Sequence, residues 1–177
     1  MTLDPSTYTQ LRFERRDDGV LLITIDNPAK YNAADEVLHG ELARVWRDVS
    51  SDAATRVAVI TGAGRAFSAG GDLGMVERMA GDHERVAHML REMSDLVWNI
   101  IDCEKPVVSA INGVAVGAGV VVALLADIAI AAEDAKLAIC PPYSLDSLLR
   151  RTTVAMAFQR LMVRMRHSIS RSPGNSC

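Results

Sequence analysis

Cysteine is scarce in this sequence, with three residues among 177. None belongs to a Cys-x-x-Cys pair, and an odd number without such spacing argues against a disulfide framework or a structural zinc site. We therefore expect a protein of a reducing compartment with no bound metal, and we place it in the cytoplasm.

Long apolar runs are also missing. The longest uncharged apolar stretch, Ile111 to Ala126, is interrupted by Asn112 and by glycines. It falls short of the roughly 20 residues that a membrane-spanning helix needs. The first ten residues are polar and contain Asp4 and Pro5, unlike the basic and then apolar start of a secretory signal. The sequence therefore predicts neither a membrane partner nor secretion.

Positive charge is lacking in the first three quarters of the chain. Residues 1–137 carry 13 lysines and arginines against 21 acids, whereas residues 138–177 carry six arginines, no lysine and one acid. Because phosphate binding needs clustered positive charge, the acidic body argues against a nucleic acid as the main partner. The abrupt reversal predicts a core over residues 1–137 and an atypical basic tail over residues 138–177.

What is present is a composition of 49% apolar and 23% charged residues, typical of one soluble globular domain. Amphipathic spacing, or small residues that open an apolar run, predicts helices over residues 34–51, 82–103 and 117–125. Short apolar runs predict strands over residues 20–26, 56–61, 107–111, 127–131 and 136–139, and the Asp-Gly turn at residues 16–19 predicts a further strand over residues 10–14 that forms a hairpin with residues 20–26. Strands that alternate with helices indicate an α/β fold.

Two segments share an arrangement that suits the binding of a negatively charged oxygen. The first runs from Ile60 to Leu73 and the second from Lys105 to Gly119. Each is an apolar strand that leads into small residues opening a helix. This layout exposes backbone N–H groups at the positively polarised start of a helix. Small side chains also let a carbonyl oxygen approach the backbone closely.

Nucleotide-binding motifs fit these segments poorly. A Walker phosphate loop requires a lysine after the glycines, and neither segment has one. Gly62 and Gly64 follow a strand as in a short-chain dehydrogenase, but Phe67 replaces the third glycine. The tyrosine–lysine pair of such enzymes is missing too, since the fourth residue after Tyr143 is Ser147. A nicotinamide-dependent oxidoreductase is therefore a remote alternative.

Four segments together resemble the crotonase family, which includes the enoyl-CoA hydratases and isomerases. Phe67 to Leu73 is similar to its F-S-A-G-x-D-L signature, and Lys105 to Gly119 is similar to K-P-x-x-x-A-x-N-G-x-x-x-G-x-G. Residues 27–33 resemble the family's early loop, and residues 126–131 resemble its C-D-x-x-x-A strand. The similarity runs from about residue 8 to residue 137, in the order and at the spacing of the family.

The resemblance implies a spiral of ββα units that binds an acyl-CoA thioester as substrate, with no metal or redox cofactor. It places the two backbone N–H donors of an oxyanion hole at Ala69 and Ala118. It also implies contacts to the adenine and pantetheine parts of CoA from Lys30, Asn32, Ala33, Gly70, Gly71, Asp72 and Leu73. A helix cap is an equally good role for Asp72.

The sequence departs from the family where proton transfer would take place. The hydratase branch has a glutamate two residues after the Gly-x-Gly of the second segment, but Val121 stands there and cannot transfer a proton. The one acid in the segment after residue 137 is Asp146, whose spacing does not recommend it as a base. We therefore expect weak or absent catalysis. The alternative is a non-catalytic CoA-binding pseudo-enzyme or an inactive fragment.

The basic tail does not continue the family pattern. Its arginines and its closing residues, 171–177, resemble an out-of-frame reading of a GC-rich gene, so we expect a frameshift or truncation near residue 138. The fold would then be incomplete at its C-terminus, and the trimers and hexamers of the family would be doubtful for this chain. As an alternative, apolar residues at helical spacing between Val154 and Ile169, with arginines among them, would give a basic amphipathic helix for a membrane or partner surface.

Overall fold

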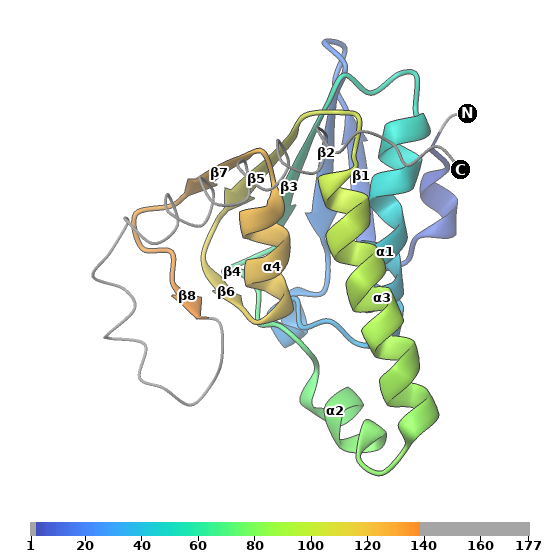
Figure 1. Ribbon diagram of the computed structural model, residues 1–177. Helices are drawn as coiled ribbons and strands as arrows, with labels where there is room; N and C mark the ends of the chain where they lie inside the picture. The colour runs from blue at the N-terminus through green and yellow to red at the C-terminus, as the bar shows by residue number, and fades with distance from the viewer. Residues whose placement is uncertain (1–2, 139–177) are drawn as a thin grey trace, which may run out of the picture.

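The structure is a computed structural model that describes residues 3–138. Its elements follow one another as ββα units (Figure 1). The strands are β1 (Leu11–Arg15), β2 (Val20–Ile25), β3 (Val57–Gly62), β4 (Ala66–Ser68), β5 (Val107–Ile111), β6 (Val114–Val116), β7 (Ile128–Ala131) and β8 (Leu137–Ala138). The helices are α1 (Glu36–Ser51), α2 (Leu73–Met79), α3 (His83–Ile101) and α4 (Ala118–Leu125), with 3₁₀ turns at Pro5–Thr7 and Pro28–Lys30. The predictions made for the tail lie outside the described residues.

The strands form two sheets. The larger one has the order β1-β2-β3-β5-β7, in which β1 and β2 are antiparallel and the other neighbours are parallel. The smaller one has the order β4-β6-β8 and is parallel throughout. Each unit sends its first strand to the large sheet and its second strand to the small one, except that β1 and β2 both join the large sheet. The α/β fold built of ββα units is confirmed.

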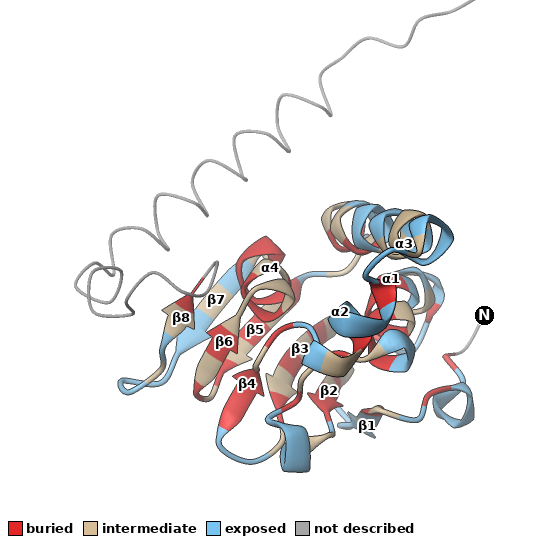
Figure 2. Cartoon of the chain, turned by 90° about the horizontal axis from the view of Figure 1, so that it is seen from below, coloured by how far each residue is buried: buried red, intermediate tan, exposed pale blue. Residues whose placement is uncertain are grey.

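The helices α1 and α3 lie side by side over the large sheet (Figure 1). The core between them and the strands contains Leu38, Trp46, Ile60 and Ile100, all fully buried. Figure 2 shows the buried residues gathered on the strands and on the inner sides of the helices. Burial of this apolar surface is the main force that holds the layers together.

Side-chain caps fix where the long helices begin. The carboxylate of Asp35 accepts hydrogen bonds from the N–H groups of Val37 and Leu38, so α1 starts one residue later. Asp82 caps α3 in the same way through the N–H of Arg85. The sequence pattern predicted both helices.

Other expectations are wrong in detail. The amphipathic spacing of residues 82–103 implies one buried apolar face, yet on α3 Leu90 is 52% exposed and Met93 is 38% exposed. The reason is that the first half of α3 extends beyond the sheet toward α2 (Figure 1). Strands β4 and β6 were not predicted, and helix α2 was expected only as a helix opening after the first small-residue run, without an end. Within residues 3–138, no helix is both long and apolar enough to cross a bilayer.

Candidate functional site

The two small-residue segments meet at one edge of the small sheet. Strands β4 and β6 are parallel neighbours, so the bends that follow them leave the sheet on the same side. The contact is close: a Cβ atom added to Gly70 would lie 2.7 Å from the carbonyl oxygen of Val116, and one on Gly119 would lie 2.8 Å from that of Ser68. Only glycine permits this approach.

Backbone conformation makes the same demand. Gly70 has φ +86°, and Gly117, which precedes α4, has φ +52° and ψ −117°. A side chain at either position would be strained, because L-residues rarely adopt positive φ. The two bends are therefore held in defined shapes by the local sequence.

Each of these bends has a backbone N–H group with no acceptor in the part of the chain that the structure describes. One belongs to Ala118, the first residue of α4, where helices leave their N–H groups unpaired. The other belongs to Gly71. Its neighbours bond to Ala34, through the oxygen of Gly70 at 2.6 Å and the nitrogen of Asp72 at 2.8 Å, so the N–H of Gly71 faces away from Ala34. Gly71 is exposed and Ala118 half-buried.

The predicted donor Ala69 is not free. Its N–H donates to the carbonyl oxygen of Tyr31 at 2.9 Å. The expectation of an available donor at this position is therefore wrong. The cause is that Tyr31, in the early loop, packs beside the bend although it is distant in sequence. The spacing of the motif does not reveal this contact.

The early loop is built around Asn32. Its amide donates to the carbonyl oxygens of Ala63 at 2.9 Å and Ala66 at 2.8 Å, and its side-chain oxygen accepts the N–H of Asn27 at 2.9 Å. Tyr31 and Asn32 both have positive φ, which such residues adopt rarely. Because Asn32 is fully buried, its side chain has no surface for a ligand. It was expected to contact CoA, but it positions the loop instead.

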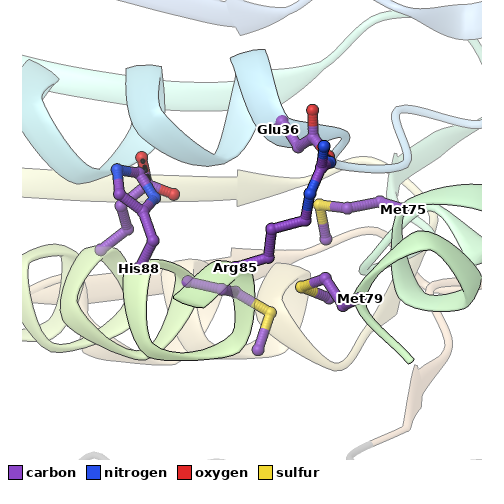
Figure 3. A pocket seen from close by; sticks show the side chains of 7 residues that line it. Glu36, Met75, Met79, Arg85 and His88 are labelled. Atoms are coloured by element: carbon purple, nitrogen blue, oxygen red, sulfur yellow. Dashed lines mark hydrogen bonds and ion pairs between the residues drawn. The ribbon is translucent and has the colours of Figure 1, made fainter. Parts of the chain in front are cut away.

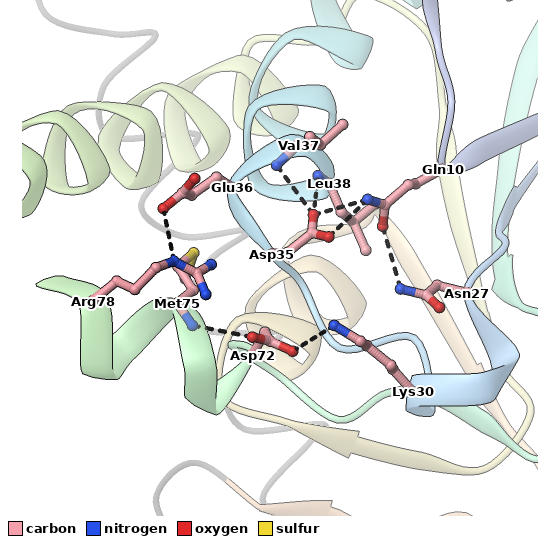
Figure 4. Close-up of polar contacts among 10 residues, drawn as sticks. All are labelled: Gln10, Asn27, Lys30, Asp35, Glu36, Val37, Leu38, Asp72, Met75 and Arg78. Atoms are coloured by element: carbon pink, nitrogen blue, oxygen red, sulfur yellow. Dashed lines mark hydrogen bonds and ion pairs between the residues drawn. The ribbon is translucent and has the colours of Figure 1, made fainter.

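Lys30 and Asp72 form an ion pair of 3.1 Å beside the bend (Figure 4). The other carboxylate oxygen of Asp72 accepts the N–H of Met75 at 3.0 Å and so caps α2. The hydrogen bond from Lys30, followed by that from Met75, lowers the pKa of Asp72. The capping role is confirmed, and the exposed side of this pair faces solvent at the rim of the site.

The remaining predicted contact residues lie in the same place. Ala33 is half-buried in the early loop, Gly70 is buried within the bend, and Leu73 is 78% exposed at the start of α2. The structure thus brings all the predicted positions around one bend. Their contact with CoA stays a prediction.

Comparison with known proteins gives this geometry a context. A family model described as "Enoyl-CoA hydratase/isomerase" matches residues 15–149, which is most of the chain.

The chain belongs to the enoyl-CoA hydratase/isomerase family.

Individual members of this family are similar to the chain. The 1,2-epoxyphenylacetyl-CoA isomerase of Escherichia coli is 37% identical over 68% of this chain and 47% of its own length. A probable enoyl-CoA hydratase of Rhodobacter capsulatus is 37% identical over 73% of this chain and 48% of its own length. A crystal structure of an enoyl-CoA hydratase/isomerase from Mycobacterium paratuberculosis has a TM-score of 0.69 and 41% identity over 73% of this chain and 51% of that one. The chain spans about half the length of the relatives it matches.

This member of the enoyl-CoA hydratase/isomerase family has no acid two residues after Gly119, where the sequence of the hydratase branch has a glutamate. Val121 lies in the first turn of α4 and packs, half-buried, against the hydrophobic core. The Val121 side chain fills space beside the core, but it has no acidic or basic group that could transfer a proton to a substrate.

Sequence reasoning missed a buried polar contact between α1 and α3. His39 on α1 is 5% exposed, and its Nδ1 lies 2.9 Å from Oε2 of Glu92 on α3. The Nδ1 of His88 lies 3.7 Å from the other oxygen of Glu92. Nothing in the sequence links residues on two separate helices, so only the packing of α1 on α3 reveals the pair. Among residues 3–138, no group of histidines, cysteines and acids is arranged to hold a metal ion.

Proposed function

We propose that this chain binds an acyl-CoA thioester and stabilises negative charge on its carbonyl oxygen with the N–H groups of Gly71 and Ala118. The observation that carries the proposal is the pair of N–H groups without acceptors, one on each of two bends that touch. Membership of a family whose members are named for CoA thioesters supports the choice of ligand.

The chemistry follows from where charge develops. When a thioester is converted to its enolate, negative charge gathers on one oxygen, and two fixed amides stabilise it without having to reorganise. Loss of one such donor typically lowers the rate by about 10²–10³. Because both donors are backbone N–H groups, the site needs no polar side chain at Gly71 or Ala118.

The rest of CoA would lie along the early loop and the start of α2. Leu73 offers exposed apolar surface next to the bend, and Lys30 offers a cation held in place by Asp72. A CoA phosphate would compete with Asp72 for this cation. The capping bond from Asp72 to α2 does not involve Lys30 and would remain.

Turnover is proposed to be weak or absent. Val121 supplies no proton-transfer group, so the stabilised charge lacks a partner acid or base at that position. A CoA-binding protein without catalysis is therefore the second candidate function, and the same observation favours it.

Calorimetric titration with acetyl-CoA, measured beside the hydration of crotonyl-CoA, tests the proposal. We expect saturable binding of acetyl-CoA together with slow or undetectable hydration. Absence of binding would overturn the proposal. Hydration at the rate of an efficient enzyme, with kcat/KM above about 10⁴ M⁻¹ s⁻¹, would contradict the weak-turnover part while supporting the ligand.

A further inference from the structure

Ser68, the last residue of β4, has a buried side chain that contacts the early loop, the first bend and helix α4. Its hydroxyl donates a hydrogen bond to the carbonyl oxygen of Asn32 at 2.8 Å and accepts one from the N–H of Gly70 at 3.2 Å. Gly119, in the first turn of α4, lies on the same side chain: a Cβ atom added there would be 3.1 Å from the hydroxyl oxygen. Ser68 is 1% exposed. Because a hydroxyl can donate and accept at once, this one side chain joins three segments.

The backbone around Gly71 is held by four hydrogen bonds. Three of its groups, the N–H of Ala69, the C=O of Gly70 and the N–H of Asp72, pair with backbone groups of residues 31 and 34. The fourth group is the N–H of Gly70, which pairs with the Ser68 hydroxyl. Within this set, the bond to Ser68 is the one that depends on a side chain and can therefore be removed by substitution.

Glycine at position 70 permits the bend but does not enforce it. Gly70 has φ +86°, and glycine populates positive and negative φ about equally readily. The peptide units on both sides of Gly70 must therefore be held by other groups. The unit after it is held through its carbonyl oxygen, by the N–H of Ala34 at 2.6 Å. The unit before it is held through its N–H, by Ser68.

Helix α2 anchors the far end of the same bend. Its buried residues Met75 and Met79 line a pocket where α2 meets the start of α1 and the first half of α3 (Figure 3). Strand β4 holds the near end by pairing with β6. The stretch whose shape remains to be set is the short one between them, and the bond from Gly70 to Ser68 lies within it.

We propose that Ser68 is a positioning residue of the oxyanion site. Its hydroxyl fixes the peptide unit before Gly70, and its contact with Gly119 keeps the first bend in register with α4. The N–H groups of Gly71 and Ala118 can then converge on one thioester oxygen. This inference rests on the proposed function, because it assigns Ser68 a role only through those two donors. Ser68 is buried and acts on the ligand through its neighbours.

Ser68→Ala tests this role, since it removes the hydroxyl and keeps a small side chain against α4. Ser109→Ala is the matched control. Ser109 is also fully buried, and its hydroxyl donates to the carbonyl oxygen of Ala123, in the last turn of α4, at 2.6 Å. This contact lies at the end of α4 away from Ala118. Both variants should lower the urea midpoint of unfolding, but only the first should disturb the donors.

Isotope-edited infrared spectroscopy of bound [1-¹³C]acetyl-CoA separates positioning from stability. A donor that points at the thioester oxygen lowers the carbonyl frequency, and its effect weakens steeply as the hydrogen bond loses alignment. We expect the bound frequency to lie below the free value in the wild-type chain and in Ser109→Ala. In Ser68→Ala it should shift back toward the free value.

The outcomes distinguish this inference from the proposed function. A wild-type frequency in Ser68→Ala, or an equal shift in Ser109→Ala, would overturn the positioning role and leave the proposed function intact. No binding to the wild-type chain, or an unshifted carbonyl in it, would overturn both. If Ser68→Ala does not fold, amide hydrogen exchange in the wild-type chain decides. The N–H of Gly70 should be protected without ligand and that of Gly71 only with acetyl-CoA, whereas fast exchange at Gly70 would overturn the inference.

Discussion

At the scale of single residues, the N–H group of Ala118 offers the sharpest test of the site. Ala118 is the first residue of α4, a position where proline fits well because the helix makes no use of that N–H group. Ala118→Pro should therefore remove the donor and leave the fold intact. We expect a loss of about 10²–10³ in the rate of any enolate-forming step, measured as proton exchange at the carbon next to the thioester.

Ala118→Gly is the matched control, since it keeps the N–H group and should retain most of the exchange rate. The unfolding midpoints of the two variants in urea should be similar. Unchanged exchange in the proline variant would show that Ala118 is not a donor.

Asn32 has a structural role that is equally open to test. Replacing it with alanine leaves the N–H of Asn27 and the carbonyl of Ala63 without their partner, and leaves the carbonyl of Ala66 with only a longer bond of 3.4 Å from Asn112. Unpaired buried polar groups are costly, so Asn32→Ala should lower the free energy of unfolding by about 3 kcal/mol. Lys30→Ala, at an exposed position in the same loop, should change it by less than about 0.5 kcal/mol. Urea unfolding of both variants checks this, and equal effects would contradict the account.

The sequence predicted some of these residues and not others for identifiable reasons. Ala118 and Asp72 lie at helix starts, and local spacing is enough to predict a free N–H group and a cap there. Ala69 was the wrong donor because Tyr31, far away in the chain, occupies its N–H group. Gly71 becomes the candidate only once the bonds of its neighbours to Ala34 are known.

At the scale of elements, Asp52 ties the end of α1 to the first strand. Its side chain is fully buried and lies 2.7 Å from the guanidinium of Arg15, and it also accepts a hydrogen bond from Thr55. Burial acts to raise the pKa of Asp52, but the hydrogen bonds from Thr55 and Arg15 outweigh it and hold the pKa below its ordinary value.

The sign of the pH dependence follows from this shift. A carboxylate whose pKa is lower in the folded state stabilises the fold above its unfolded pKa, and this contribution is lost as the pH falls through the folded value. We expect Asp52→Asn to lower the free energy of unfolding by about 2 kcal/mol at pH 7. The difference from wild type should shrink below about pH 4. Urea unfolding from pH 2 to pH 7 measures both effects, and a gap at pH 2 as large as the gap at pH 7 would contradict them.

Helices and strands with a clear pattern of apolar residues were predictable from the sequence, and elements too short to show such a pattern were not. Helices α1 and α3 show amphipathic spacing and acidic caps, and the strands of the large sheet other than β1 are apolar runs. Strands β4 and β6 have three residues each, which is too short for a periodic signal. They exist because the chain pairs them across two units, and that pairing is what brings the two bends together.

At the scale of the whole molecule, the edge strand β7 bears exposed apolar residues. Ile128 is 52% exposed and Ile130 is 60% exposed, and alternate residues of a strand share one face. Exposed apolar edges favour association. We expect the double variant Ile128→Thr with Ile130→Thr to scatter less light at high concentration than the wild-type chain, with little change in the unfolding midpoint. The pair of valine substitutions is the control and should still associate, and equal scattering by both variants would be contrary to this prediction.

The order of the ββα units along the chain was predictable from the four motifs. The contact between the two bends was not. Motif spacing fixes which segment follows which, whereas the distribution of strands between two sheets depends on pairing far along the chain. The site is therefore a property of the assembled fold: the second and third units each contribute one bend.

The most direct test of the account is the carbonyl stretching frequency of a ¹³C-labelled thioester bound to the chain, measured by isotope-edited infrared spectroscopy. Two N–H groups that converge on the oxygen polarise the C=O bond, so we predict a frequency below that of free acyl-CoA in the wild-type chain and in Ala118→Gly. In Ala118→Pro the frequency should move back toward the free value. A bound thioester whose carbonyl vibrates as it does in water would contradict the account.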